Sequence, residues 1–268
     1  MNNNVLGAII TVLVIASLSF VITIAGGNIL PSHEIRGLAE AYLKYSYNPW
    51  HPDFTAYSPE AVTSIVWDFR GLDTVFETAV FYLAIIGSIA LARGYKVYFK
   101  PDELDLEKYG LSLIVKNVTR ISAPLILVVA ASIALHGHLT PGGGFQGGST
   151  AAVAPLLVLI VFSQYFLLSR GIKKESMLLL RSIGLTGIGL TAISVYLYAV
   201  ASGSWGYVLQ NQPKIGAPVG MPTHILGQLI SGSLWFFNIF EFFAVMAGFT
   251  IVFLLLTIPE KAYRGEEK

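Results

Sequence analysis

Three charged residues at the start of an apolar segment could handle protons or cations. Arg70, Asp73 and Glu77 follow one another at offsets of three and seven residues. On a helix these offsets share one face, so the three side chains can form one cluster. Glu77 would lie about one turn or more inside the apolar run, where an ionised carboxylate is costly unless it faces protein, water or an opposite charge. A proton or cation relay could use that cost, because desolvation raises the pKa of a carboxylate. The structural alternative is an interfacial salt bridge that anchors the helix end.

A glycine-rich run from Gly137 to Gly148 separates two apolar segments. It resembles a phosphate-binding loop in spacing, but Gly148 stands where that loop needs a lysine, which argues against nucleotide binding. Glycines allow a second backbone to approach closely, as in a re-entrant turn buried against protein. The residues expected to build this structural glycine loop are Pro141, Gly142, Gly143, Gly144, Gly147 and Gly148.

His136 and His138 border this run. Two positions apart, they would diverge on a helix, and no nearby Cys or carboxylate completes a zinc set, so we expect no metal site. An ordinary histidine titrates near neutrality, which would suit proton handling. Capping of a helix end is the structural alternative.

Glu241 is the only charged residue between Lys214 and Glu260, and phenylalanines surround it in the sequence. A carboxyl group in such a segment is either functional or holds an interhelical hydrogen bond, and the sequence leaves both open. We expect Lys116 and Arg120 to extend toward lipid headgroups. No Ser/His/Asp or metal-ligand constellation indicates catalysis, so we expect no enzyme activity in this chain.

The composition predicts the environment in which these residues must work. Of 268 residues, 54% are hydrophobic and 12% charged, a balance typical of membrane proteins. A net charge of +1 gives no field to attract nucleic acid. Because the chain has no Cys, it can hold no Cys-ligated cluster or zinc, and we expect no cofactor.

Apolar runs of about 20 residues are long enough to cross a bilayer as helices. About six are present, so the predicted fold is an all-α integral membrane protein that crosses the cell membrane several times. The runs are Val5 to Ala25, Leu72 to Leu91, Leu111 to Leu135, Ser149 to Leu168, Met177 to Ala201 and Leu234 to Ile258. A short interfacial helix is expected within Ser32 to Leu43.

Basic residues predict the orientation. They gather in the connection after the second apolar run, in the connection after the fourth run and at the C-terminal end, and Arg181 is assigned to the second of these connections. Because basic residues favour the cytoplasmic side, this distribution predicts that both termini are cytoplasmic. The charged stretch from Arg93 to Gly110 is the best boundary between the two halves of the chain. The expected organisation is a two-helix unit over residues 1–100, a linker over 101–110 and a four-helix unit over 111–268.

The segment Gly137 to Gly148 closely resembles the signature of the MnhB subunit of the Mrp/Mnh multisubunit sodium/proton antiporters, and residues from about Leu111 to Thr257 look like that whole subunit. Trp67 to Thr74 with Glu77 resembles the C-terminal tail of the large subunit of the same antiporters. Related subunits occur in archaeal membrane-bound hydrogenase and sulfane reductase complexes.

This resemblance implies a membrane subunit that assists cation/proton translocation beside other Mrp-like subunits, in contact with lipid and with Na+ and H+ as the transported ions. It also implies ion or proton transfer by the carboxylate matching Glu77. The fusion of the two units favours a respiratory complex. The alternatives are a purely structural scaffold of the membrane arm, one component of a free-standing Mrp antiporter, or an independent transporter.

Overall fold

The computed structural model describes residues 3–28, 35–92 and 110–258. Six helices in these ranges are long and apolar enough to cross a membrane, which confirms the predicted all-α multi-pass membrane protein. The predicted linker over 101–110 lies outside the described residues except for Gly110. The domain boundaries and the cytoplasmic placement of the termini therefore stay predictions.

The membrane-spanning helices are α1 (Asn3–Asn28), α4 (Gly71–Leu91), α5 (Leu113–Leu135), α6 (Gly144–Phe162), α8 (Lys174–Ala201) and α9 (Ser233–Leu255). The shorter elements are α2 (Gly37–Ser46), α3 (Ala61–Thr63), the π-helix η1 (Ser64–Phe69), α7 (Gln164–Ser169) and the antiparallel strands β1 (His224–Ile225) and β2 (Gln228–Leu229).

The predicted fourth span, Ser149 to Leu168, was wrong at both ends. α6 begins at Gly144, so part of the glycine run is already helical, and it ends at Phe162. At Ser163 the backbone has φ 121°, a conformation that a non-glycine residue rarely adopts, and α7 follows as a separate helix. The helix expected within Ser32 to Leu43 lies at Gly37–Ser46.

The described chain forms two compact units, 1–41 and 42–268. In the first, the apolar side chains of α1 between Val5 and Gly26 are exposed, and none of this span is buried within the described chain. A helix that is hydrophobic all round must find lipid or another protein for those side chains.

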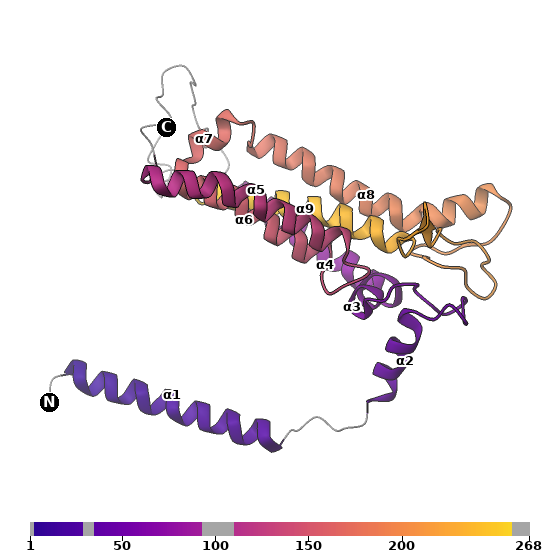
Figure 1. Ribbon diagram of the computed structural model, residues 1–268, viewed down its shortest axis with the longest axis horizontal. Helices are drawn as coiled ribbons and strands as arrows, with labels where there is room; N and C mark the ends of the chain where they lie inside the picture. The colour runs from indigo at the N-terminus through magenta and orange to yellow at the C-terminus, as the bar shows by residue number, and fades with distance from the viewer. Residues whose placement is uncertain (1–2, 29–34, 93–109, 259–268) are drawn as a thin grey trace. The chain divides into compact units, whose positions relative to one another are not determined.

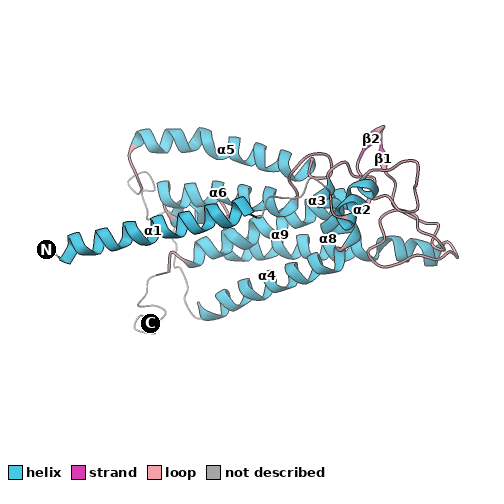
Figure 2. Cartoon of the chain, turned by 90° about the horizontal axis from the view of Figure 1, so that it is seen from below, coloured by secondary structure: helices cyan, strands magenta, loops and turns pink. Residues whose placement is uncertain are grey.

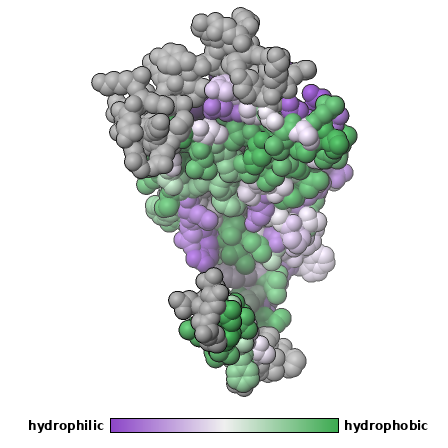
Figure 3. Space-filling view, turned by 90° about the vertical axis from the view of Figure 1, so that its left-hand side faces the viewer, coloured by the Kyte–Doolittle hydropathy of each residue, from purple (hydrophilic) through white to green (hydrophobic). Residues whose placement is uncertain are grey.

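In the second unit, α9 lies at the centre of the bundle. It packs against α6 and α8, α6 packs against α5, and α4 packs against α9 and η1. These helices run side by side in both views (Figures 1 and 2). Hydrophobic residues cover much of the visible surface in Figure 3, as expected of a protein whose solvent is lipid.

One end of the bundle is closed by a core that joins η1 to α9. Trp67 and Phe237 stack with ring centroids 4.3 Å apart and an interplanar angle of 1°. Ile188 of α8 and Leu234 belong to the same buried cluster. Trp67 is thereby fixed in position by aromatic and aliphatic packing on several sides.

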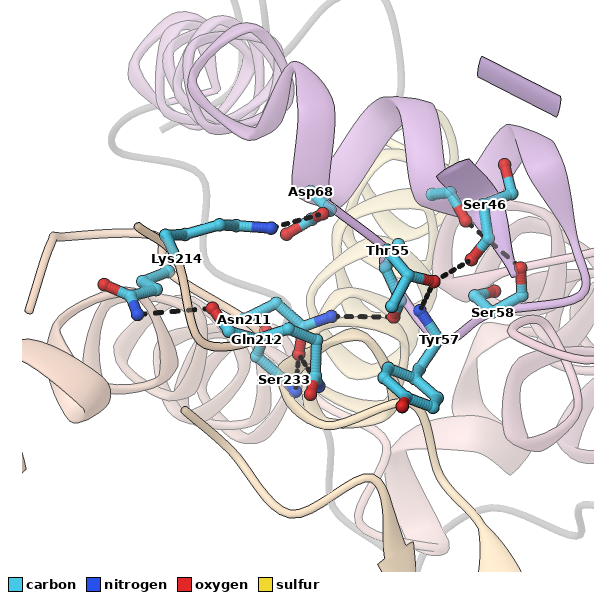
Figure 4. A network of polar contacts seen from close by, with 12 residues as sticks. Ser46, Thr55, Tyr57, Ser58, Asp68, Asn211, Gln212, Lys214 and Ser233 are labelled. Atoms are coloured by element: carbon cyan, nitrogen blue, oxygen red, sulfur yellow. Dashed lines mark hydrogen bonds and ion pairs between the residues drawn. The ribbon is translucent and has the colours of Figure 1, made fainter. Parts of the chain in front are cut away.

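A polar network lies beside this core and ties the segment before η1 to the loop that follows α8 (Figure 4). Asn211, fully buried, donates from Nδ2 to the Ala56 carbonyl at 3.0 Å. Its Oδ1 accepts from the Ser233 N–H at 2.9 Å and from Gln212 Nε2 at 3.0 Å. Asn211 therefore holds the start of α9 and two distant loops together.

Replacing Asn211 with alanine should lower the free energy of unfolding by about 2–4 kcal/mol, because each buried partner left unpaired costs about 1–3 kcal/mol. Thermal unfolding in detergent measures the loss. The control is Asn117→Ala on α5, where the asparagine is exposed and accepts a hydrogen bond from the exposed Arg120. Equal midpoints for the two variants would contradict the assignment.

Candidate ion-transfer site

The turn between α5 and α6 brings several backbones unusually close together. At Gly143 φ is 139°, in the region that favours glycine. A Cβ on Gly137 would stand 2.6 Å from the Gly143 Cα, and one on Gly147 would stand 2.8 Å from the Ala130 carbonyl oxygen. Glycine is thus required by close approach at Gly137 and Gly147 and by backbone conformation at Gly143.

The carboxyl group of Glu241 lies against the first turn of α6. The Phe145 backbone N–H and the Trp67 side chain lie close enough to it to stabilise a negative charge. A Cβ on Gly144 would stand 2.6 Å from Glu241 Oε2, so only glycine leaves room for the carboxylate. A helix N-terminus presents unpaired N–H groups and a partial positive charge, which together stabilise an anion.

Asn238, one turn before Glu241 on α9, is held at the same place. Its Oδ1 accepts from the Gly144 N–H at 3.2 Å. Its Nδ2 is buried and has no hydrogen-bond partner within the described chain. Asn238 therefore caps the Gly144 N–H of α6 with Glu241 beside it, and its amide nitrogen has no partner within the described chain.

Glu77 of α4 is the other carboxylate of this region. Its side chain is exposed on the isolated chain, and it lies close enough to Glu241 for the two carboxylates to interact electrostatically. Arg70 and Asp73 form an ion pair through Arg70 Nε and Nη2, with both side chains exposed. Arg70 therefore pairs with Asp73, and Glu77 is exposed on the same helix.

The two histidines have different surroundings. His138 Nε2 lies 2.8 Å from the Leu229 carbonyl, which can only accept, so Nε2 carries the proton and Nδ1 is left without a partner within the described chain. Burial lowers the pKa of His138 below its ordinary value, although the Leu229 bond opposes this. The ring is neutral at pH 7. His136 is exposed and lies 3.0 Å from the Ser132 carbonyl through Nδ1.

Arg181 does not lie in a cytoplasmic connection, as its place in the sequence had indicated. It is 1% exposed within α8, donates from Nη1 to the Ala244 carbonyl at 2.7 Å, and lies over the Phe81 ring with Cζ 4.7 Å from the centroid. A guanidinium on an aromatic face gains a cation–π interaction that partly offsets desolvation. Arg181 thus links α8, α9 and α4.

No group of three His, Asp or Glu side chains in residues 3–28, 35–92 and 110–258 is placed to hold a metal ion. The site is built instead from carboxylates, an amide, an indole and helix N–H groups. Such a set of groups can hold a proton or a small ion in a region of low dielectric constant. There, a change of one charge strongly alters how tightly the proton or ion is bound.

A family model described as "Domain related to MnhB subunit of Na+/H+ antiporter" matches residues 114–251, just over half of the chain. The chain belongs to this family. The matched MnhB-related region runs from α5 to α9 and includes the glycine turn, Asn238 and Glu241.

Two relatives extend beyond the MnhB-related region. An uncharacterized protein of Methanocaldococcus jannaschii is 27% identical over 227 residues, or 78% of this chain and 83% of that protein. A chain in the structure of the membrane-bound sulfane sulfur reductase, an archaeal respiratory membrane complex, is 26% identical and superposes with a TM-score of 0.60, covering 96% of this chain and 97% of its own length.

The Mrp complex from Dietzia sp. DQ12-45-1b shares the fold. Its matching chain is 17% identical with a TM-score of 0.58, over 91% of this chain and 26% of the other. The MnhB-related fold is therefore found in a respiratory complex and in an Mrp complex alike.

The structure brings together only some of the residues that the sequence singled out. Glu241 lies against Gly144 of α6 and interacts electrostatically with Glu77, whereas His136, His138 and the Arg70–Asp73 pair make other contacts. Trp67 was missed as a neighbour of Glu241. The sequence did carry a signal, since Trp67 opens the segment that resembles the large antiporter subunit's tail.

Proposed function

We propose that the chain is a non-catalytic membrane subunit of a multisubunit Na+/H+ antiporter module within a respiratory complex of the membrane-bound hydrogenase or sulfane reductase type. There it assists cation and proton translocation beside other Mrp-like subunits and lipid, and it carries no cofactor of its own. Near-full-length correspondence with a chain of the sulfane sulfur reductase complex supports the respiratory assignment over a free-standing Mrp antiporter.

The observation that carries the proposal is the position of the Glu241 carboxyl group against the first turn of α6. Glu241 is 7% exposed among spanning helices, close to the Phe145 N–H, the Trp67 side chain and a second carboxylate, Glu77. Its carboxyl group can change its charge at a cost set by these surroundings. Because Glu77 faces outward from the chain, a neighbouring subunit can exchange an ion with it.

Replacing Glu77 with glutamine or alanine in the intact complex tests the role. We expect an assembled complex whose sodium-dependent proton transport falls about tenfold or more, because proton transfer by a positioned side chain contributes roughly 10²–10⁴-fold. Flux is measured in proteoliposomes. Glu175→Gln is the matched control, since Glu175 is 74% exposed and starts α8 outside the site. Wild-type transport and assembly in both Glu77 variants would defeat the relay.

A structural scaffold is the second candidate, and the close approach of α6 and α9 favours it. A Cβ on Gly148 would stand 2.7 Å from the Phe242 carbonyl oxygen, which is packing tight enough to serve assembly alone. For a scaffold, the Glu77 variants either disrupt assembly or change nothing, and no assembled but inactive complex appears. The neighbouring reading frames separate the parent complexes: hydrogenase-like or complex I-like soluble subunits indicate redox-driven pumping, and antiporter subunits alone indicate secondary exchange.

A further inference from the structure

A cavity of about 290 Å³ lies between η1, the start of α4 and the loop that follows α8. Its polar side chains come from both sides, and its walls include Phe69, Leu72 and Leu209. Asp68 contributes the carboxylate and Lys214 the ammonium that face each other in this cavity (Figure 4).

The Asp68 carboxylate is almost fully removed from solvent. Its side chain is 3% exposed, and Oδ2 makes no hydrogen bond within the described chain. The Lys214 Nζ lies 3.7 Å from Oδ2 and its side chain is 30% exposed. At that distance the two charges attract each other without a hydrogen bond, so the ammonium can move toward water and back.

The other polar groups around Asp68 are already occupied or offer no charge. Arg70 pairs with Asp73. Gln210 uses its oxygen for the Tyr207 N–H and its nitrogen for the carbonyls of Gln212, Ala217 and Val219. Tyr207 lines the cavity from the loop. Lys214 is therefore the one cation of the described residues that faces Asp68 without another carboxylate to hold it.

Asp68 is also joined to the ion-transfer site through a short path. It follows Trp67 in η1, and the Trp67 side chain lies close to the Glu241 carboxyl group and stacks on Phe237. The Arg70 N–H donates to the Ile65 carbonyl at 2.8 Å, and this hydrogen bond closes the wide π-helical turn. Single π-helical turns occur frequently at functional sites. This one carries Trp67, which lies beside Glu241, and the cavity residue Asp68 at adjacent positions.

We propose that Asp68 is a proton-binding site that serves the membrane site around Glu241, with Lys214 as its tethered and displaceable counter-ion. The carboxylate takes a proton from water in the cavity and becomes a carboxylic acid. Lys214 keeps its own proton and withdraws toward solvent, so the pair changes from neutral to a single positive charge. This inference rests on the proposed function, because it assigns a supply of protons to that site.

The electrostatics favour this assignment. Burial raises the pKa of Asp68 to about 6, and the charge of Lys214 and its interaction with the carboxylate limit that rise. Asp68 is therefore ionised and paired with Lys214 above pH 6 and protonated below it. A site that changes charge close to neutral pH can bind and release a proton within the physiological range.

Infrared difference spectroscopy of the intact complex during a pH titration tests the assignment. We expect a carboxylic acid band that appears as the pH falls through about 6 and that Asp68→Asn removes. In Lys214→Met the midpoint should rise by about one pH unit, because a nearby opposite charge shifts a carboxyl pKa by roughly 1–3 units. Asp53→Asn is the control, since Asp53 is an exposed loop carboxylate of the same connection.

Two results would overturn the proposal. One is a band that survives Asp68→Asn, or a midpoint that Lys214→Met leaves unchanged. The other is a band that responds to sodium at constant pH, which would make Asp68 a cation site. Lys214→Met keeps the test usable if Asp68→Asn fails to assemble.

Transport separates this inference from the proposed function. If the Glu77 and Glu241 variants stop transport while assembled Asp68→Asn turns over at the wild-type rate, the proton-supply role alone is wrong. If the Glu77 and Glu241 variants transport normally, the proposed function is wrong whatever the titration shows. The expected result is that Asp68→Asn transports about tenfold less than Asp53→Asn, as for other positioned proton carriers.

Discussion

Replacing Glu241 with glutamine should leave the complex assembled and lower its sodium-dependent proton transport about tenfold or more, the loss expected when a positioned proton carrier is removed. Glutamine has nearly the same volume and keeps an oxygen acceptor for the Phe145 N–H or the Trp67 side chain. It cannot take up or release a proton. The variant therefore removes the change of charge and preserves most of the packing.

Transport by reconstituted complexes, together with subunit composition on a native gel, measures both effects. The exposed Glu175→Gln variant again serves as the control for a lost carboxylate. An assembled Glu241→Gln complex with wild-type transport would mean that Glu241 only holds α6, η1 and α9 together. A complex that fails to assemble would favour the scaffold.

Replacing Gly144 with alanine should lower the free energy of unfolding by about 1–3 kcal/mol, the usual cost of inserting a methyl group into a packed interior. The new Cβ would stand 2.4 Å from the Asn238 carbonyl oxygen and 2.6 Å from the Glu241 Cβ. Both neighbours belong to α9, so relief requires two helices to separate. We expect the upper end of this range because the contact with Asn238 involves backbone.

Gly189→Ala on α8 is the matched control, since nothing lies within 4 Å of its new Cβ. Alanine favours helix over glycine by up to about 1 kcal/mol, so this variant should match or exceed the wild type. Thermal unfolding of both variants in detergent gives the comparison. If Gly144→Ala were as stable as Gly189→Ala, α6 and α9 would not be in close contact at Gly144.

Much of the fold could be predicted from the sequence because lipid imposes a simple rule. A helix must be long and apolar enough to span the membrane, and this requirement marks α1, α4, α5, α8 and α9 with little error. The start of α6 was harder to place. Glycines are poor helix formers, so Gly144 to Gly148 reads as a loop, yet packing against α5 and α9 makes the segment helical.

The site was harder to predict than the fold because its contacts join residues far apart in the chain. Hydropathy identified Glu241 and Glu77 as charged residues in apolar runs, but it gave no sign that the Trp67 side chain would reach Glu241. Arg181 looked like a loop cation because charged residues precede it in the sequence, and only the packing of α8 against α9 shows that it is buried.

The hydrogen bonds between the early segment and the MnhB-related region bear on how such a gene can evolve. Ser58 donates to the His138 carbonyl at 2.6 Å, Thr63 donates to the Gly137 carbonyl at 2.6 Å, and Ser231 donates to the Tyr57 carbonyl at 2.6 Å. None of these bonds depends on a covalent connection between residues 92 and 110. One continuous chain fixes the ratio of the two segments at one to one and raises their effective concentration.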